Sequence, residues 1–362
     1  MTETHYLFLL SRIKGISHNT ALQLLEQMGS ATAIFENTDA LPEKARKEIL
    51  SQRAEALQRT EQELAFCEEK GIRMLSIHDA DYPTRLRTCA EAPFTIFYKG
   101  TASLNAKRTI AVVGTRKITE YGRAFCQDLC KDLASLIPDC LIVSGLAYGV
   151  DIHAHRACLK NSLPTVAVLA HGLDRIYPTM HRATAVEMLN RGGLLTEYAA
   201  GTAPDKGNFV RRNRIVAGMT DCTLVVESAE HGGALITAEL AGTYGRRVFA
   251  LPGRTTDAYS AGCNQLIRTG HATLVTSAEE LVETMGWREK GTQPAPQQAS
   301  LFPELTPTEA KLYDQLPTGE SLPVNDLLRR TGLTYAETTA VLFELQMKNL
   351  VELLPGNRVR RI

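Results

Sequence analysis

The sequence predicts an α/β protein built around a doubly wound, mostly parallel sheet, with a helical domain before the sheet and a winged-helix domain after it. Between residues 71 and 286, short apolar runs alternate with stretches of helical periodicity, as in a parallel sheet covered by helices on both faces. In residues 1–70 the apolar positions recur at three- and four-residue intervals, which indicates helices alone.

The chain is long enough for several domains and carries no net charge, with 362 residues and 40 Lys+Arg against 40 Asp+Glu. Its longest apolar runs fall well short of the roughly 18 residues that a membrane span requires. The first apolar run, Tyr6–Leu10, lacks the basic leader of a signal peptide. We therefore expect a cytoplasmic protein with no membrane partner.

Cysteine and histidine residues give no sign of a metal site or a cofactor. The eight cysteines are scattered without paired metal-type spacing, which favours reduced thiols in the core. His153 and His155 are two residues apart, so on a helix they would point to different sides. No serine stands in a G-x-S-x-G elbow. We expect no catalytic residue, no metal and no cofactor.

The N-terminal domain, residues 1–70, resembles a helix-hairpin-helix or SAM-like module around Ile13–Ser17. Such hairpins can present backbone N–H groups to DNA phosphates. However, residues 1–70 contain eight Lys+Arg and eleven Asp+Glu, a net charge of −3. This balance favours packing or partner recruitment, and leaves DNA binding as the less favoured alternative.

The central domain, residues 71–286, is expected to form an extended Rossmann-like sheet. Ligands of such sheets bind at the carboxyl ends of the strands. The apolar runs that we expect as strands are Ile110–Val113, Leu141–Val143, Thr165–Leu169, Leu194–Thr196, Thr223–Val226, Val248–Leu251 and Thr273–Val275.

Glycine-rich turns follow three of the expected strands. They are Gly114–Arg116, Ser144–Gly149 and His231–Gly233. Glycine at a strand-to-helix turn lets an anion approach backbone N–H groups and the positive end of a helix dipole. Neither a G-x-G-x-x-G nor a G-x-x-x-x-G-K-[ST] motif is present, so dinucleotide and P-loop sites are disfavoured. We take Gly114, Thr115, Ser144 and Gly145 as candidate binding residues.

The segment 204–214 is expected to be a loop with the largest local excess of positive charge. Its five charged residues, Asp205, Lys206, Arg211, Arg212 and Arg214, sum to +3. Phe209 stands among them. An aromatic ring between cations suits single-stranded nucleic acid, which offers phosphates and unpaired bases. The alternative is that Phe209 staples the start of the following helix and the arginines occupy a solvated face.

After residue 286 the composition changes. Residues 287–305 are expected to be a linker, because Gly291–Ser300 is rich in Gln, Pro and Ala. Residues 306–362 then read as a winged helix that opens with a capping box at Thr306–Glu309 and closes with a hairpin at Pro355–Asn357. Seven Lys+Arg against seven Asp+Glu favour a protein-contact or structural role there. Arg358, Arg360 and Arg361 keep a weaker wing contact to DNA open.

Together these motifs resemble the DNA-processing protein A family (DprA, also called Smf). The resemblance covers most of the central domain in order. The residues that carry it are Val113-Gly114-Thr115-Arg116, Tyr121-Gly122, Ser144-Gly145-Leu146-Ala147, Gly149, Asp151, His155, Gly172-Leu173-Asp174, Tyr177-Pro178, Phe209, Arg212-Asn213-Arg214, Ala234–Ala238 and Leu251-Pro252-Gly253.

The resemblance implies a non-enzymatic, homodimeric protein that binds single-stranded DNA and loads the recombinase RecA during natural transformation and recombination. In that family, the pocket uses an arginine after the first strand and a Lys-x-x-Phe pair before the R-N-R run. The corresponding positions here are Arg116, Lys206 and Phe209, with Arg211, Arg212, Asn213 and Arg214 beside them. The chain departs from the family pattern at Ala170-His171, Thr196 and Gly232.

Two other function classes remain open at this point. One is a nucleotide-processing enzyme of the lysine-decarboxylase-like phosphoribohydrolase type, because Gly232-Gly233 precedes Thr237 and Glu239. The spacing differs by one residue from the G-G-x-G-T-x-x-E pattern of those enzymes. The other is a structural scaffold, which leaves the charged segment without a purpose.

Overall fold

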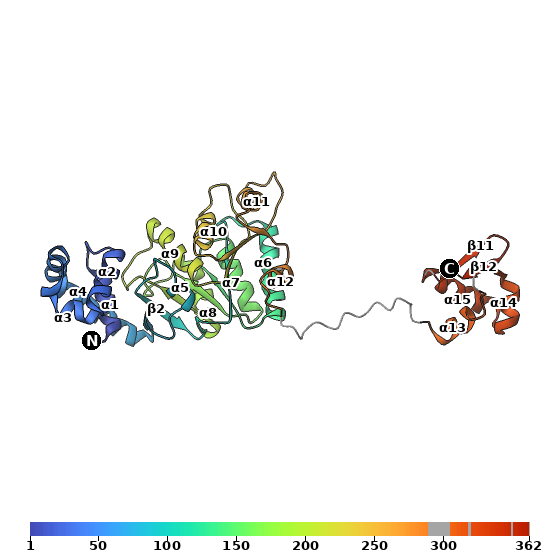
Figure 1. Cartoon of the computed structure of the whole chain (residues 1–362), viewed down its shortest axis with the longest axis horizontal. Coiled ribbons are helices and arrows are strands. Elements are labelled where there is room, and N and C mark those ends of the chain that lie inside the picture. The colour runs from blue at the N-terminus through green and yellow to red at the C-terminus, as the bar shows by residue number, and fades with distance from the viewer. Residues whose placement is uncertain (289–304, 318–319, 349, 362) are drawn as a thin grey trace. The chain divides into compact units, whose positions relative to one another are not determined.

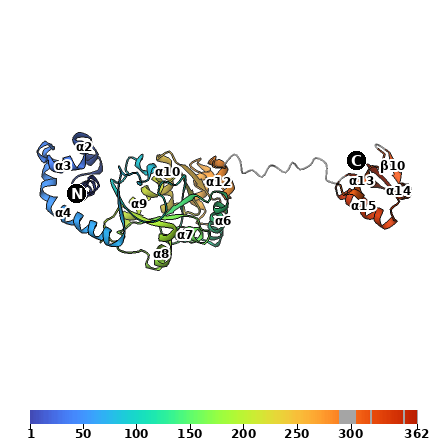
Figure 2. The same cartoon turned by 90° about the horizontal axis from the view of Figure 1, so that it is seen from below.

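The structure is a computed structural model that describes residues 1–288, 305–317, 320–348 and 350–361. The chain divides into two compact units, Met1–Arg288 and Glu289–Ile362, which Figures 1 and 2 colour from blue to red along the sequence. The linker predicted at 287–305 lies almost wholly outside the described residues.

The N-terminal segment is helical, as predicted. Ile13–Ser17 joins the first two helices, and the Ser17 hydroxyl caps the second by accepting the N–H of Thr20. Figure 2 shows the long helix α4 leading from this segment to the sheet. The segment also packs on the sheet, since the Phe8 and Phe97 rings meet edge to face at 5.4 Å. The helices are α1 Glu3–Arg12, α2 His18–Met28, α3 Ala31–Glu36, η1 Thr38–Ala40 and α4 Glu43–Lys70.

A nine-stranded sheet with the order β1-β2-β6-β5-β4-β3-β7-β8-β9 forms the centre of this unit. All seven predicted strands are present and pair in parallel with their neighbours among these seven. Two strands that were not predicted, β1 and β2, add an antiparallel edge. The strands are β1 Arg73–Ser76, β2 Thr95–Gly100, β3 Arg108–Val113, β4 Cys140–Ser144, β5 Thr165–Val168, β6 Gly192–Thr196, β7 Cys222–Val225, β8 Arg247–Ala250 and β9 Thr273–Leu274.

Helices cover both faces of the sheet, which confirms the doubly wound fold. Successive strand residues enter opposite cores: Ala111 and Val113 face α9 and α10, whereas Ile110 and Val112 face α6, α7 and α12. All eight cysteines are buried and unpaired by disulfides, as predicted. The helices are α5 Thr84–Arg87, α6 Glu120–Leu136, α7 Val150–Lys160, η2 Thr179–His181, α8 Arg182–Arg191, α9 Lys206–Gly218, α10 Gly233–Thr243, α11 Ala261–Arg268 and α12 Ala278–Thr284.

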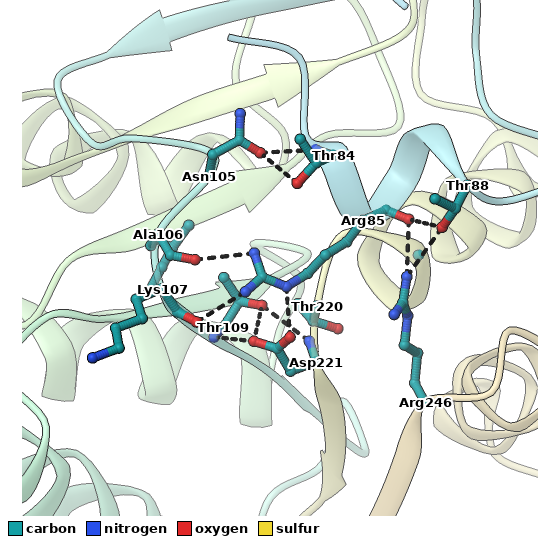
Figure 3. Close-up of polar contacts among 12 residues, drawn as sticks. Thr84, Arg85, Thr88, Asn105, Ala106, Lys107, Thr109, Thr220, Asp221 and Arg246 are labelled. Carbon is teal, nitrogen blue, oxygen red and sulfur yellow. Dashed lines mark hydrogen bonds and ion pairs between the residues drawn. The ribbon is translucent and has the colours of Figure 1, made fainter. Parts of the chain in front are cut away.

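The amino ends of the two central strands are joined by Asp221 (Figure 3). One of its carboxylate oxygens accepts a hydrogen bond from the backbone nitrogen of Thr109 at 2.8 Å. The other accepts a hydrogen bond from Nε of Arg85 at 2.6 Å. Arg85 also donates to the carbonyl groups of Ala106 and Lys107. This cluster sets β3 beside β7 and so places the carboxyl ends of both strands at one point.

At the carboxyl ends of the strands, a buried arginine joins β4 to β5. Arg212 of α9 is 4% exposed and donates to the carbonyl groups of Gly145 and Val168. The neighbouring Asp151 carboxylate accepts the N–H groups of Gly145 and Ala147. Burial raises the pKa of Asp151, while the positive charge of Arg212 acts in the opposite direction.

The second unit is a winged helix, as predicted. Thr306 and Glu309 form the expected capping box. The wing turns at Gly356 and Asn357, which both have positive φ. Among the described residues of the whole chain, no helix combines the length and the hydropathy that crossing a bilayer requires. The elements are α13 Pro307–Tyr313, β10 Ser321–Pro323, α14 Val324–Thr331, α15 Tyr335–Met347, β11 Val351–Leu354 and β12 Arg358–Arg361.

Replacing Arg212 with alanine is expected to lower the free energy of unfolding by about 3–5 kcal/mol, because Asp151 would remain buried without its cation. Arg211→Ala is the matched control, since Arg211 is exposed on the same helix and should change stability by no more than about 0.5 kcal/mol. Urea unfolding of both variants measures the difference. Equal stability of the two variants would show that the Arg212 contacts contribute little.

Candidate nucleic-acid interface

A cavity of about 750 Å³ opens at the carboxyl ends of β3, β4 and β7. Strand order reverses at β3, which pairs with β4 on one side and β7 on the other, so this is the switch point where doubly wound sheets bind ligands. The cavity is lined by the turns after β3 and β4, one face of α9 and the first turns of α10. Eight of the predicted site residues line it: Gly114, Thr115, Arg116, Gly145, Lys206, Phe209, Arg212 and Asn213.

The prediction that 204–214 is a loop is wrong, because α9 begins at Lys206. The Asp205 carboxylate caps this helix by accepting the N–H of Gly207 at 2.8 Å. Lys206, Phe209 and Asn213 stand at helical spacing and line the cavity together. Arg211 and Arg214 fall on other sides of the helix and do not line it. The charged side chains of this segment therefore point to different sides of α9 and do not form one cluster.

The Phe209 ring lies close to a cation and to a second aromatic ring. The guanidinium carbon of Arg116 is 5.2 Å from the Phe209 centroid, and the Tyr177 ring is 5.8 Å from it on centroids. Phe209 is half-buried, whereas Arg116 and Lys206 are exposed. The cavity thus combines an apolar ring with two exposed cations that can meet phosphates.

The expectation of unpaired positive charge is wrong for Arg212 and Arg214. The Arg212 guanidinium donates hydrogen bonds to the carbonyl groups of Gly145 and Val168. Arg214 pairs with Glu197 at 2.5 Å, and both side chains are nearly buried, at 12% and 13% exposure. Burial raises the pKa of Glu197, and Arg214 opposes that rise. Both arginines are therefore engaged in holding the protein together.

The backbone groups predicted to cradle an anion are already used inside the protein. The N–H of Thr115 donates to the Glu227 carbonyl at 2.7 Å, and the N–H of Gly145 donates to Asp151. Ser144 is buried outside the cavity, and its hydroxyl donates to the Val112 carbonyl at 2.6 Å. These contacts give the residues of the turns a packing role within the protein.

Glycine is required at positions 114 and 145 because side chains of neighbouring helices pack directly against the backbone there. A Cβ on Gly114 would lie 2.3 Å from a methyl carbon of Val150. A Cβ on Gly145 would lie 2.2 Å from a guanidinium nitrogen of Arg212. Both distances are shorter than carbon atoms tolerate, so these positions bring α7 and α9 against the strands.

Two parts of the cavity were not among the candidate binding residues, although the sequence analysis named the segments that contain them. Tyr177 was noted within a motif but not as a site residue, although an exposed aromatic side chain at 43% exposure is a typical binding feature. The N-terminus of α10, with Gly232 and Gly233, also lines the cavity. That end of a helix carries a partial positive charge and attracts anions. The glycine pair in the sequence was the available signal.

The histidines of α7 have roles within the fold. Nδ1 of His155 lies 2.7 Å from the Thr165 hydroxyl, and burial lowers the pKa of His155 to about 3. His153 lies apart from it, half-buried at the edge of the fold. In the part of the chain that the structure describes, no group of three or more His, Cys, Asp or Glu side chains is placed to hold a metal ion.

Comparison with known proteins identifies the family. The model of the family described as "DNA recombination-mediator protein A" matches residues 73–286, and that of the "DprA winged helix domain" matches residues 293–357. Protein Smf of Escherichia coli K12 is 33% identical over 303 residues, covering 83% of this chain and 80% of that protein.

Two solved structures agree with this assignment. DNA processing protein A (DprA) of Streptococcus pneumoniae is 32% identical with a TM-score of 0.65, covering 78% of this chain and 98% of that chain. DNA processing protein A of Helicobacter pylori, whose structure was described for its single-stranded DNA binding mode, is 28% identical with a TM-score of 0.54, covering 60% and 96%. The fold, the cavity at the switch point and these matches lead to one conclusion: the chain belongs to the DprA family of DNA-processing proteins.

Proposed function

We propose that the cavity at the carboxyl ends of β3, β4 and β7 binds single-stranded DNA without strong sequence preference. The observation that carries the proposal is the Phe209 ring close to both Arg116 and Tyr177, with Lys206 exposed on the same helix. A ring of this kind stacks on any unpaired base, while the cations neutralise phosphates on either side. The single-stranded DNA binding described for the Helicobacter pylori protein supports the proposal.

We further propose that this binding is not coupled to catalysis. The carboxylates that line the cavity are Asp151 and Asp205. Asp151 is buried and accepts two backbone N–H groups, and Asp205 caps α9, so neither is free to transfer a proton.

The alternative of a nucleotide-processing enzyme depends on Thr237 and Glu239 acting side by side. Thr237 lines the cavity, whereas Glu239 is exposed on α10 outside it. The one-residue change of spacing noted in the sequence therefore separates the two side chains. Release of a base from nucleoside monophosphates by the purified protein, absent from an Arg116→Ala variant, would favour the enzyme instead.

The family membership also motivates a biological role in the cytoplasm. We propose that a homodimer of this chain coats single-stranded DNA and loads the recombinase RecA on it during natural transformation and recombination. In a dimer, a strand bound in one cavity meets the cavity of the other subunit at a raised effective concentration.

We propose that the winged helix contacts protein rather than DNA. Its helix α15 carries no Lys or Arg and exposes Tyr335, Phe343 and Met347, at 59%, 59% and 69%. The wing arginines have partners within the unit: Arg358 donates to Ser321, Arg360 pairs with Glu352, and Arg361 stacks over the ring of Tyr313 at 4.0 Å. Few phosphate contacts remain for this surface to make.

The protein is expected to bind a single strand more tightly than a duplex of equal length, and Phe209→Ala should weaken that binding by about 1–3 kcal/mol through lost stacking. The log–log salt dependence should stay nearly unchanged in Phe209→Ala, because a ring releases no counterion. Lys206→Ala should instead reduce the slope by about 0.7. Fluorescence anisotropy across a salt series measures both quantities.

Arg211→Ala is the matched control for Lys206→Ala, because Arg211 is an exposed cation of the same helix that points away from the cavity. If both changes reduce the slope equally, the cavity is not the DNA site. The melting temperature of Phe209→Ala must match that of the parent protein. A lower melting temperature together with a changed slope would favour the helix-staple role of Phe209.

Addition of the protein is expected to shorten the lag before RecA assembles on single-stranded DNA that is coated with a single-strand-binding protein. Arg116→Ala should lose this effect in parallel with its loss of DNA binding. Light scattering at micromolar concentration should show a dimer. A strictly monomeric protein with full activity would contradict the dimer, and an unchanged lag would contradict the loading role.

Removal of residues 289–362 is expected to leave single-strand affinity within about tenfold, or 1.4 kcal/mol, of the intact protein. The reason is that the winged helix has balanced charge and engaged arginines, and that Met1–Arg288 is a compact unit by itself. Anisotropy with the same oligonucleotide compares the two proteins. A greater loss would make the winged helix a primary DNA site.

A further inference from the structure

A second cavity, of about 270 Å³, adjoins the first. The two cavities share Arg116, which lines both. The second cavity is bounded by the turn after β3, the loop after β4, and the helices α6 and α7, and Phe209 is not among its lining residues. Of the predicted nucleic-acid-binding residues, only Arg116 lines it.

Cations line this second cavity without any carboxylate among the lining residues. Lys117, Arg123 and Arg156 join Arg116 there. Arg123 pairs with Glu120 of its own helix. Since the whole chain has no net charge, such an excess is a local feature. Four cations against one adjacent carboxylate leave a charge of about +3 facing the solvent.

Two of these cations have single partners within the protein, since Arg123 pairs with Glu120 and Nε of Arg156 donates to the Thr184 hydroxyl at 3.3 Å. Nε of Arg123 is buried and has no hydrogen-bond partner among the described residues. The pKa of His153, which lines the same cavity, is lowered by burial and then by repulsion from Arg123 and Arg156. The positive charges of Arg123 and Arg156 therefore reach into the cavity as far as His153.

An aromatic ring completes the second cavity. Tyr148 is 41% exposed and meets the His181 ring edge to face at 5.1 Å. His181 is itself fixed, because its Nδ1 lies 2.8 Å from the Leu146 carbonyl oxygen. Tyr148 thus has a supported ring with an open surface, next to cations, as Phe209 has in the first cavity.

Building on the proposed function, we propose that the second cavity is a subsite for the adjacent nucleotides of the same DNA strand. Tyr148 stacks on one unpaired base. Lys117, Arg123 and Arg156 bind the phosphates that follow it, and Arg116 binds the phosphate that passes between the two cavities. The strand therefore runs from the Phe209 ring across Arg116 to the Tyr148 ring.

A single strand fits these features better than a free nucleotide or a phosphopeptide. Two aromatic rings on either side of a shared arginine match a ligand in which bases alternate with phosphates. A free nucleotide would fill one cavity and make no use of the other. A phosphopeptide would need the cations but would give the two rings no bases to stack on.

The test is a series of oligothymidylates from about four to about sixteen nucleotides, the range that one site covers. Phe209→Ala should weaken binding at every length. Tyr148→Ala and Arg156→Ala should leave the shortest oligonucleotide unaffected and weaken the longest by about tenfold. Arg156→Ala should also lower the salt slope, by about 0.7, on the long oligonucleotide alone.

Controls separate the subsite from general effects. Tyr148→Phe keeps the ring and should bind every length like the parent protein, while Lys131→Ala removes an exposed cation of α6 outside both cavities and should change nothing. Parental binding of all lengths by Tyr148→Ala and Arg156→Ala, with Phe209→Ala impaired, would overturn the subsite alone. Parental binding by Phe209→Ala as well would overturn the proposed function. Arg156 is exposed, so its variant tests the subsite even if Tyr148→Ala is unstable.

Discussion

The buried guanidinium of Arg212 is the interaction on which the binding face depends. It donates to the carbonyl groups of Gly145, which follows β4, and of Val168, which ends β5, and the negative charge of Asp151 from α7 stabilises it. A cation without water is unfavourable unless such partners surround it. Because these partners come from three separate elements, the pairing fixes α9 over the switch point. Lys206 and Phe209 owe their positions above the cavity to this anchored helix.

The cations on and beside α9 therefore have different physical roles. Arg212 and Arg214 are satisfied by the protein itself, by strand carbonyls and by Glu197. Arg116 and Lys206 are exposed beside an aromatic ring. In a protein with no net charge, only the charges that the fold leaves unpaired can attract a charged ligand. In the DprA family fold of this chain, that charge gathers where the strands end.

The antiparallel strands β1 and β2 connect the helical segment to the sheet. β2 pairs with β6, and Phe97 of β2 receives the ring of Phe8 from α1. The Glu63 carboxylate of α4 accepts the N–H of Ala200, two strands further into the unit. Shared apolar surface and a partly buried hydrogen bond make Met1–Arg288 one compact unit, although the apolar periodicity of the sequence changes near residue 70.

The sequence alone determined the parallel strands, the N-terminal helices and the winged helix, because burial on both sheet faces demands continuous apolar runs and helix caps demand particular residues. It did not reveal β1 and β2, whose short runs stand close to turns. Nor did it reveal that α9 begins at Lys206, because the polar face of that helix lines a cavity and blurs the apolar period. Tertiary structure alone decided which arginines are free. Arg116 and Arg212 are the same residue type. They differ because the ends of β4 and β5 meet around Arg212 and bury it, whereas Arg116 stays exposed.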